Sequence, residues 1–306
     1  MFRFGIEQKI FNIGRIKIGG QPGEYPTAIA GTMFYDGDKI VSNPVQGIFD
    51  RDAAEALIRR QEELSEKTGN PHLVDVVGST PEAITKYIDF VADVTRAPIL
   101  VDSLSVEVRI KGCKHAVEVG LRDRTVYNSI TPLVTEQEIL LIRETGIDTA
   151  IILAFSSGEH FQPERKLRLL EGGAEEEGLL HKAERAGIRK ILIDTSVIDI
   201  ASIAYAGSSI KLIKERLGLP AGCAPCNSID TWNRVDEFGE HSRKTCIAGL
   251  AIIIQCVGGN FILYGPIKRA GIVFPACAMI DAITTYNAKT KGYEPEDKNS
   301  PLYKIF

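Results

Sequence analysis

Short apolar runs alternate with longer helix-like segments along most of the chain. Residues 97–103 (APILVDS) precede the helix-like segment SVEVRIKGCKHAVEVG, and residues 125–130 (TVYNSI) precede TEQEILLIRETG. From residue 26 onward, eight such units of one strand and one helix fit the sequence. Because each connecting helix returns the chain to the same edge of a sheet, this alternation predicts parallel strands.

Two parallel architectures compete for this pattern. A (β/α)8 barrel needs eight units and typically about 250 residues. A doubly wound open sheet usually carries a GxGxxG turn after its first strand, and none follows the apolar run 26–34. We therefore predict an α/β fold of the TIM (β/α)8 barrel type. Its strands are expected within residues 26–34, 72–78, 97–103, 125–130, 148–155, 189–195, 220–224 and 261–267. Helices are expected at 51–69, 79–95, 105–120, 135–146, 174–187, 197–217, 241–257 and 274–292, the fifth with an acidic first turn.

The chain before the first barrel strand has a different pattern. Residues 9–20 (KIFNIGRIKIGG) alternate and turn like a β-hairpin, so residues 1–25 are expected to form a hairpin extension under the barrel. No stretch rich in Pro, Gly or Ser divides the rest of the chain, and residues 1–306 are therefore predicted to form a single domain.

Charge and hydropathy exclude several classes of protein. The net charge of −4 and the absence of a clustered Lys/Arg stripe argue against nucleic-acid binding. The longest strongly apolar stretch, residues 247–257, is far shorter than the roughly 20 residues that cross a membrane. The N-terminus mixes charged and apolar residues and lacks the apolar region of a signal peptide. We expect a soluble, cytoplasmic protein with no membrane span.

Six cysteines are too few, in a chain this long, for a disulfide framework. Cys223 and Cys226 form a CxxC pair, which is typical of zinc and redox sites. A zinc ion needs two further ligands, and the sequence has no second CxxC or close pair of histidines. We therefore expect structural thiols and no metal site.

Polar residues stand where the predicted strands end. In a parallel barrel all carboxyl ends of the strands face one mouth, and active sites lie there. The residues at these ends are Asp75, Asp102, Asn128, Ser156, Asp194 and Asn227. Carboxylates gathered in a buried place repel one another unless hydrogen-bond donors face them. The pattern therefore favours a ligand rich in N–H donors.

Other interpretations of these strand ends exist. A single Asp or Asn after a strand often caps the next helix or satisfies a turn. Capping alone, however, is a poor explanation for so many Asp and Asn residues at the same end of the barrel. A phosphate ligand is less favoured because Lys and Arg are scarce at the strand ends. Lys268 and Arg269, after the last strand, are the exception, and they stand where many barrels bind phosphate.

Three long segments resemble a known family. They are FRFGIEQKIF with GGQPGEYPT near the N-terminus, residues 47–103, and EVGLRDRTVYNSI at 118–130. They resemble the H subunit of tetrahydromethanopterin S-methyltransferase and its bacterial relatives, the methylcorrinoid-protein:tetrahydrofolate methyltransferases of glycine betaine and quaternary amine demethylation. The resemblance spans nearly the whole chain and is strongest over residues 1–130. It implies a pterin-binding barrel, similar in fold to dihydropteroate synthases.

The resemblance implies roles for the residues at the strand ends. Asp102, Asn128 with Ser129, and Asp194 match pterin-binding positions, while Asp75 and Ser156 are expected beside them on the rim. Carboxylates accept hydrogen bonds from the ring N–H and amino group of a pterin, and an amide both donates and accepts. Asn227 matches the asparagine near the methyl-accepting nitrogen and is the expected catalytic residue.

The reaction implied is methyl transfer from a methyl-Co(III) corrinoid, carried on a separate protein, to N5 of tetrahydrofolate, in a homodimeric enzyme that binds no cofactor tightly itself. One alternative is the same chemistry with tetrahydromethanopterin, as the H subunit of a methyltransferase complex. Another is a different pterin enzyme, such as one with a diphosphate site at Lys268 and Arg269. A third is a non-catalytic pterin-binding subunit, and the last is a metabolic barrel enzyme with an unrelated ligand.

Overall fold

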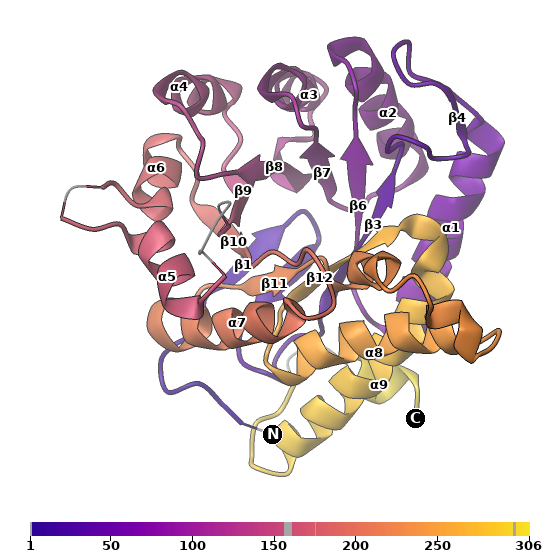
Figure 1. The fold of residues 1–306 in the computed structure, drawn as a ribbon, viewed down its shortest axis with the longest axis vertical. Helices are drawn as coiled ribbons and strands as arrows, with labels where there is room; N and C mark the ends of the chain where they lie inside the picture. The colour runs from indigo at the N-terminus through magenta and orange to yellow at the C-terminus, as the bar shows by residue number, and fades with distance from the viewer. Residues whose placement is uncertain (1, 156–160, 175, 296–297) are drawn as a thin grey trace.

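The computed structural model describes residues 2–155, 161–174, 176–295 and 298–306, and eight parallel strands within these ranges close a barrel (Figure 1). Each strand lies inside one of the ranges expected from the sequence, so the TIM barrel prediction is confirmed. In order around the barrel the strands are β3 (Ala28–Met33), β6 (His72–Val77), β7 (Ile99–Asp102), β8 (Thr125–Ile130), β9 (Thr149–Leu153), β10 (Lys190–Asp194), β11 (Ala221–Cys223) and β12 (Phe261–Pro266).

Helices surround this barrel (Figure 1). They are α1 (Arg51–Thr68), α2 (Pro81–Val94), α3 (Val106–Glu118), α4 (Glu136–Thr145), α5 (Pro163–Glu171), α6 (Leu179–Arg185), α7 (Ile203–Leu217), α8 (Ser242–Cys256), α9 (Ala270–Lys289) and α10 (Pro301–Lys304). Local sequence sets their ends. Thr80 caps α2 by accepting a hydrogen bond from the Ala83 N–H, and Pro81 takes the first helical position. Gly69 ends α1 in the left-handed conformation, as its sequence predicts.

The inward faces of four barrel strands, β6, β7, β8 and β10, share one pattern. A buried aliphatic residue is followed two positions later by a polar one, and residues two apart in a strand point to the same face. The pairs are Leu73 and Asp75, Leu100 and Asp102, Val126 and Asn128, and Leu192 and Asp194. The aliphatic members pack together inside the barrel. The barrel is therefore apolar toward the amino ends of its strands and polar toward their carboxyl ends.

The predicted N-terminal hairpin is confirmed and closes the apolar end of the barrel. Strands β1 (Ile10–Ile13) and β2 (Ile16–Gly19) pair antiparallel. Ile13 and Ile18 are fully buried and pack with the aliphatic residues inside the barrel. Lys214, on α7, donates to the Gly20 carbonyl just after the hairpin. Access to the interior is thus left to the opposite, polar end.

Several elements differ from the sequence-based expectation. A second hairpin, β4 (Val41–Asn43) with β5 (Ile48–Phe49), lies between β3 and α1 and was not predicted. The helix expected at 174–187 begins only at Leu179, so its predicted acidic first turn is wrong. Glu177 instead pairs with Gly172 across a short bridge, which holds that segment outside the helix.

Short 3-10 helices were also missed. They are η1 (Arg122–Arg124), η2 (Pro225–Thr231), η3 (Val235–Phe238) and η4 (Ile267–Arg269). Helix α7 begins at Ile203 rather than 197, and α5 was not expected. Among the helices of the described residues, none combines the length and apolarity that a membrane crossing requires.

Candidate functional site

A pocket of about 590 Å³ opens at the carboxyl ends of the barrel strands. It is lined by Thr32, Asp75, Asp102, Ser103, Leu104, Val106, Arg109, Asn128, Ser129, Thr131, Leu133, Glu138, Leu153, Asp194, Ala224, Asn227, Leu263 and Gly265. Six of the seven site residues expected from the sequence are in this set, and Ser156 lies outside the described residues. A larger hollow of about 680 Å³ lies beside the N-terminal hairpin, away from the strand ends that carry the carboxyl groups. Its volume therefore does not make it the better candidate.

Asp75 forms the buried floor of the pocket. Its Oδ2 accepts a hydrogen bond from the Thr32 hydroxyl at 2.9 Å, and its Oδ1 accepts one from Asn128 Nδ2 at 3.2 Å. Burial raises the pKa of Asp75 to about 6, against the effect of these two bonds. Because Asn128 donates through Nδ2, its carbonyl oxygen is the atom left to accept from a ligand.

Asp102 and Asp194 are the other two aspartates of the pocket, the first half-buried and the second buried. Burial, followed by the charge of Asp75, raises the pKa of Asp102 well above its ordinary value, while Arg109 opposes the shift. Burial raises the pKa of Asp194 to about 6, although the Ser196 N–H donates to its Oδ1 at 2.6 Å. In water-poor surroundings these groups ionise readily only when further donors face them. A ligand with several N–H donors would supply what the protein lacks.

A buried triad that sequence reasoning missed contributes Arg109 and Glu138 to the pocket lining, with Tyr127 behind them. Arg109 on α3 donates through Nε to the Tyr127 hydroxyl at 2.9 Å and through Nη2 to Glu138 Oε1 at 3.1 Å. The Tyr127 hydroxyl donates to the same Glu138 oxygen at 2.7 Å. Arg109 and Glu138 come from helices rather than strand ends, which is why strand-end counting passed over them. The available signal was a charged Arg109 on the same helix face as the apolar Cys113.

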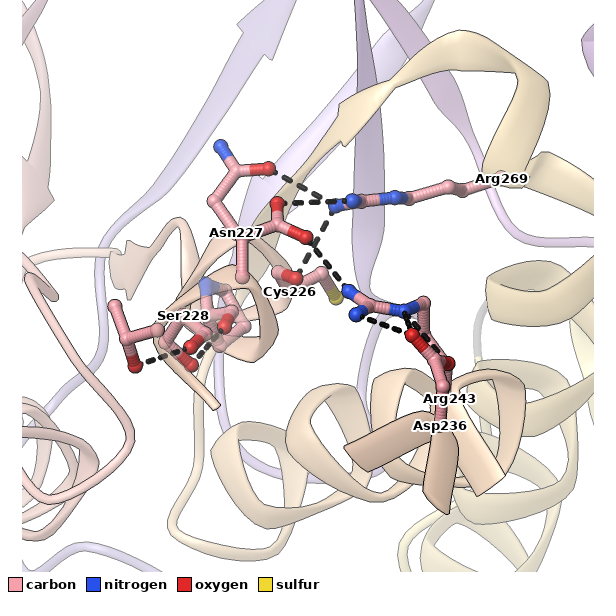
Figure 2. A network of polar contacts seen from close by, with 9 residues as sticks. Cys226, Asn227, Ser228, Asp236, Arg243 and Arg269 are labelled. Carbon is pink, nitrogen blue, oxygen red and sulfur yellow. Dashed lines mark hydrogen bonds and ion pairs between the residues drawn. The ribbon is translucent and has the colours of Figure 1, made fainter. Parts of the chain in front are cut away.

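Asn227 reaches the pocket from η2 rather than from a strand. Figure 2 shows its side chain beside the guanidinium of Arg269, which donates to Asn227 Oδ1 at 3.0 Å. Arg269 also pairs with Asp230 at 3.2 Å, while Lys268 is exposed. Of the two basic residues considered for a phosphate site, Lys268 is therefore open to solvent, whereas Arg269 is already bound to protein groups.

The cysteine pair near Asn227 is buried. Cys223 and Cys226 are free thiols, and burial raises the pKa of Cys226 to about 12, so it stays neutral. Within the described ranges, no cluster of three or more His, Cys, Asp or Glu residues could hold a metal ion. Burial lowers the pKa of His72 to about 4, and this residue begins β6 at the opposite end of the barrel.

The sequence matches the family model described as tetrahydromethanopterin S-methyltransferase MtrH subunit over residues 6–296. The H subunit of tetrahydromethanopterin S-methyltransferase from Methanothermobacter thermautotrophicus is 42% identical over 313 residues, covering 100% of both chains. The H subunit of the putative methyltransferase mtx from Methanosarcina barkeri is 41% identical over 307 residues, covering 98% of each chain.

Among solved structures, the chain is similar to Yersinia pestis DHPS in complex with a pterine-sulfa conjugate. The TM-score is 0.60 at 13% identity, and the match covers 91% of this chain and 100% of the other. At that identity the likeness supports the barrel fold alone.

Proposed function

Because the chain belongs to the tetrahydromethanopterin S-methyltransferase MtrH subunit family, we propose that it moves a methyl group to or from N5 of a tetrahydropterin held in the barrel pocket. Tetrahydromethanopterin is the pterin that we propose, since the names of several of the similar proteins specify it. This replaces tetrahydrofolate, which the sequence alone favoured. The methyl group is exchanged with a cobalt corrinoid on a partner protein.

The grouping of three aspartate carboxyl groups, Asp75, Asp102 and Asp194, around one pocket carries this proposal. A pterin offers a ring N–H and an amino group side by side on its pyrimidine edge. Asp102 and Asp194 would accept these hydrogen bonds, and the Asn128 carbonyl oxygen, left free by the bond to Asp75, would accept another. A volume of about 590 Å³ suits a small molecule of this kind.

The residues act chiefly by position. Carboxylates that hold the pyrimidine edge fix where N5 lies, and such orientation lowers the entropic part of the barrier. Asn227, which also lines the pocket, is the side chain that we assign to N5. The corrinoid, when the partner presents it, supplies the metal–carbon chemistry. Leu104 and Leu133, both highly exposed on the loops after β7 and β8, form an apolar edge against which a partner could pack.

The test is calorimetric titration of the purified protein with tetrahydromethanopterin and, separately, with tetrahydrofolate. We expect tight binding of tetrahydromethanopterin that disappears in Asp102→Ala, because that variant loses a hydrogen-bond acceptor of the pocket. Asp123→Ala is the matched control, since Asp123 is exposed in η1 at the opposite end of the barrel. It should bind as the wild type does.

The outcomes separate the parts of the proposal. Binding of tetrahydrofolate alone would keep a pterin methyltransferase but reject our choice of pterin. Binding of neither pterin would reject the pocket as a pterin site. Binding without methyl exchange in the presence of a corrinoid and the partner subunits would indicate a non-catalytic pterin-binding subunit.

A further inference from the structure

Arg269, at the start of α9, holds the side chain of Asn227 in one orientation. Its Nη1 donates to Asn227 Oδ1 at 3.0 Å and to the Cys226 carbonyl at 3.2 Å (Figure 2). A guanidinium has donors and no acceptor, so the amide atom that faces it must be the oxygen. Turning the amide over would set two donors against each other. The amide nitrogen of Asn227 therefore faces away from Arg269.

The guanidinium is itself held from its far side. Its Nη2 pairs with Asp230 Oδ2 at 3.2 Å, and Arg243 Nη1 pairs with Asp230 Oδ1 at 2.9 Å. Arg243 also pairs with Asp236 at 2.8 Å (Figure 2). The Arg269 side chain is only 14% exposed. Each pair alone is weak at the surface, but linked pairs restrict the positions open to Arg269.

Gly265, on β12, adds a steric restriction that is independent of charge. A Cβ built there would lie 2.0 Å from Asn227 Oδ1 and 3.1 Å from its Nδ2. The Asn227 amide thus lies directly against the backbone of this residue. Both Asn227 and Gly265 line the pocket. One polar contact and one close packing contact therefore fix the same amide group.

We propose that Arg269 is a positioning residue that makes Asn227 present Nδ2, a hydrogen-bond donor, to the pocket. No described residue accepts a hydrogen bond from that nitrogen, so it is left for a ligand. The inference rests on the proposed function, because it takes N5 of the tetrahydropterin as the acceptor. It assigns Arg269 to the methyl-transfer machinery rather than to phosphate binding.

A donor at this place has a defined chemical use. When the N5–CH3 bond breaks, its electron pair stays on N5 and the methyl group passes to the cobalt(I) corrinoid of the partner. N5 then takes a proton from solvent. A donor aimed at N5 stabilises the electron pair as it forms, and the nearby guanidinium charge strengthens that donor by polarising the amide.

A double-mutant cycle tests this role. The variants are Asn227→Ala, Arg269→Met and the double variant, with demethylation of methyltetrahydromethanopterin by cob(I)alamin as the measured rate. Each single change should lower the rate by about 10²-fold, the usual loss when one transition-state donor is removed. The double variant should match Asn227→Ala within about twofold, because the two residues act as one unit. Pterin affinity from calorimetry should stay within about threefold, since the carboxyl groups that bind the pyrimidine edge are intact.

Controls distinguish positioning from a structural role. Arg234→Met removes an exposed arginine of the same region, whose partner is Glu237, and should leave rate and affinity unchanged. Asp230→Asn loosens Arg269 without removing it and should lower the rate less than Arg269→Met does. It also serves if Arg269→Met does not fold. Losses that multiply in the double variant, or a rate loss explained entirely by weaker pterin binding, would overturn the inference.

A second readout does not depend on activity. The side-chain amide NMR signals of Asn227, identified by their loss in Asn227→Ala, should move in Arg269→Met but not in Arg234→Met. They should also move when tetrahydromethanopterin binds to the wild type. If the wild type binds no tetrahydropterin, the proposed function fails, and the first comparison still tests Arg269. Signals that do not change in Arg269→Met would overturn the positioning role itself.

Discussion

Burying the carboxyl group of Asp194 lowers the folding stability of the ligand-free protein. Burial raises its pKa to about 6 from 3.8, and each pKa unit corresponds to about 1.4 kcal/mol of folding free energy. Lys166 acts in the opposite direction through its charge. This unfavourable free energy fits the ligand-binding role that we propose for Asp194, since a residue kept only for stability would not carry it.

Asp194→Asn should stabilise the ligand-free protein by about 1–2 kcal/mol at pH 8, because it removes a buried charge and keeps an oxygen for the Ser196 N–H. Tetrahydropterin binding should weaken at least tenfold, since an acceptor becomes partly a donor. Urea denaturation and calorimetry measure the two effects. Asp123→Asn, on the exposed surface, should change neither, and a less stable Asp194→Asn with normal affinity would contradict the prediction.

Gly265→Ala should lower the methyl-transfer rate more than a control variant that loses the same amount of stability. Its φ of +74° strains any side chain, and the new Cβ would also displace the Asn227 amide. Gly146→Ala is the matched control, because Gly146 has a φ of +75° with nothing within 4 Å of the added Cβ. Both variants should lose about 1–2 kcal/mol in thermal unfolding from backbone strain alone. Equal activity in the two variants would show that crowding of Asn227 has no role.

The sequence was sufficient to predict the site residues whose position depends on the periodicity of the strands. Asp75, Asp102, Asn128 and Asp194 each stand two positions after an inward aliphatic residue, and the structure brings them into one pocket. Arg109 and Glu138 could not be placed in this way. Their approach depends on how α3 and α4 pack on the barrel, and no local pattern encodes that contact.

At the scale of elements, the eight strands and most helices were predictable because hydrophobic periodicity and end residues agree. Thr80 and Pro81 mark the start of α2, and Gly69 marks the end of α1. Most failures were short elements, beside helix α5 and the starts of α6 and α7. The hairpin β4–β5 and the helix η2 have few residues and no sustained period, so tertiary contacts decide their conformation. Asn227 lies in such an element.

The N-terminal hairpin should contribute measurably to the stability of the barrel. Ile18→Ala empties a fully buried position beside the aliphatic residues inside the barrel, and we expect a loss of about 2–4 kcal/mol in urea denaturation. Ile48→Ala, in the half-exposed hairpin β4–β5, should cost well under about 1 kcal/mol. Equal losses at the two positions would contradict the view that β1–β2 completes the core.

At the scale of the whole molecule, the buried carboxyl groups link stability to pH. Asp75, Asp194 and Asp281 each have a pKa raised by burial to about 6 from 3.8. Between these values the folded state binds more protons than the unfolded state does. Their contribution to the free energy of unfolding therefore falls as the pH rises through this window, by at most about 3 kcal/mol for each group.

The double variant Asp75→Asn/Asp194→Asn isolates that contribution. Its stability relative to the wild type should grow from about pH 4 to about pH 7, as measured by urea denaturation of both proteins at each pH. Saturating tetrahydropterin should stabilise the wild type most at the upper end of this range, because the ligand favours the ionised carboxylates. A difference between the two proteins that does not change with pH would show that these groups do not titrate in the window.

The inward pattern, an aliphatic residue followed two positions later by a polar one, has an evolutionary consequence. Each of these four strands gives one aliphatic residue to the layer that fills the barrel and the next inward residue to the lining of the pocket. A mutation at one of the polar positions, at the carboxyl ends of the strands, can alter which molecule is recognised. The aliphatic layer toward the amino ends is then inherited unchanged. In a lineage that comes to bind new pterins, substitutions should therefore accumulate first at the polar positions. The aliphatic positions should exchange only one aliphatic residue for another.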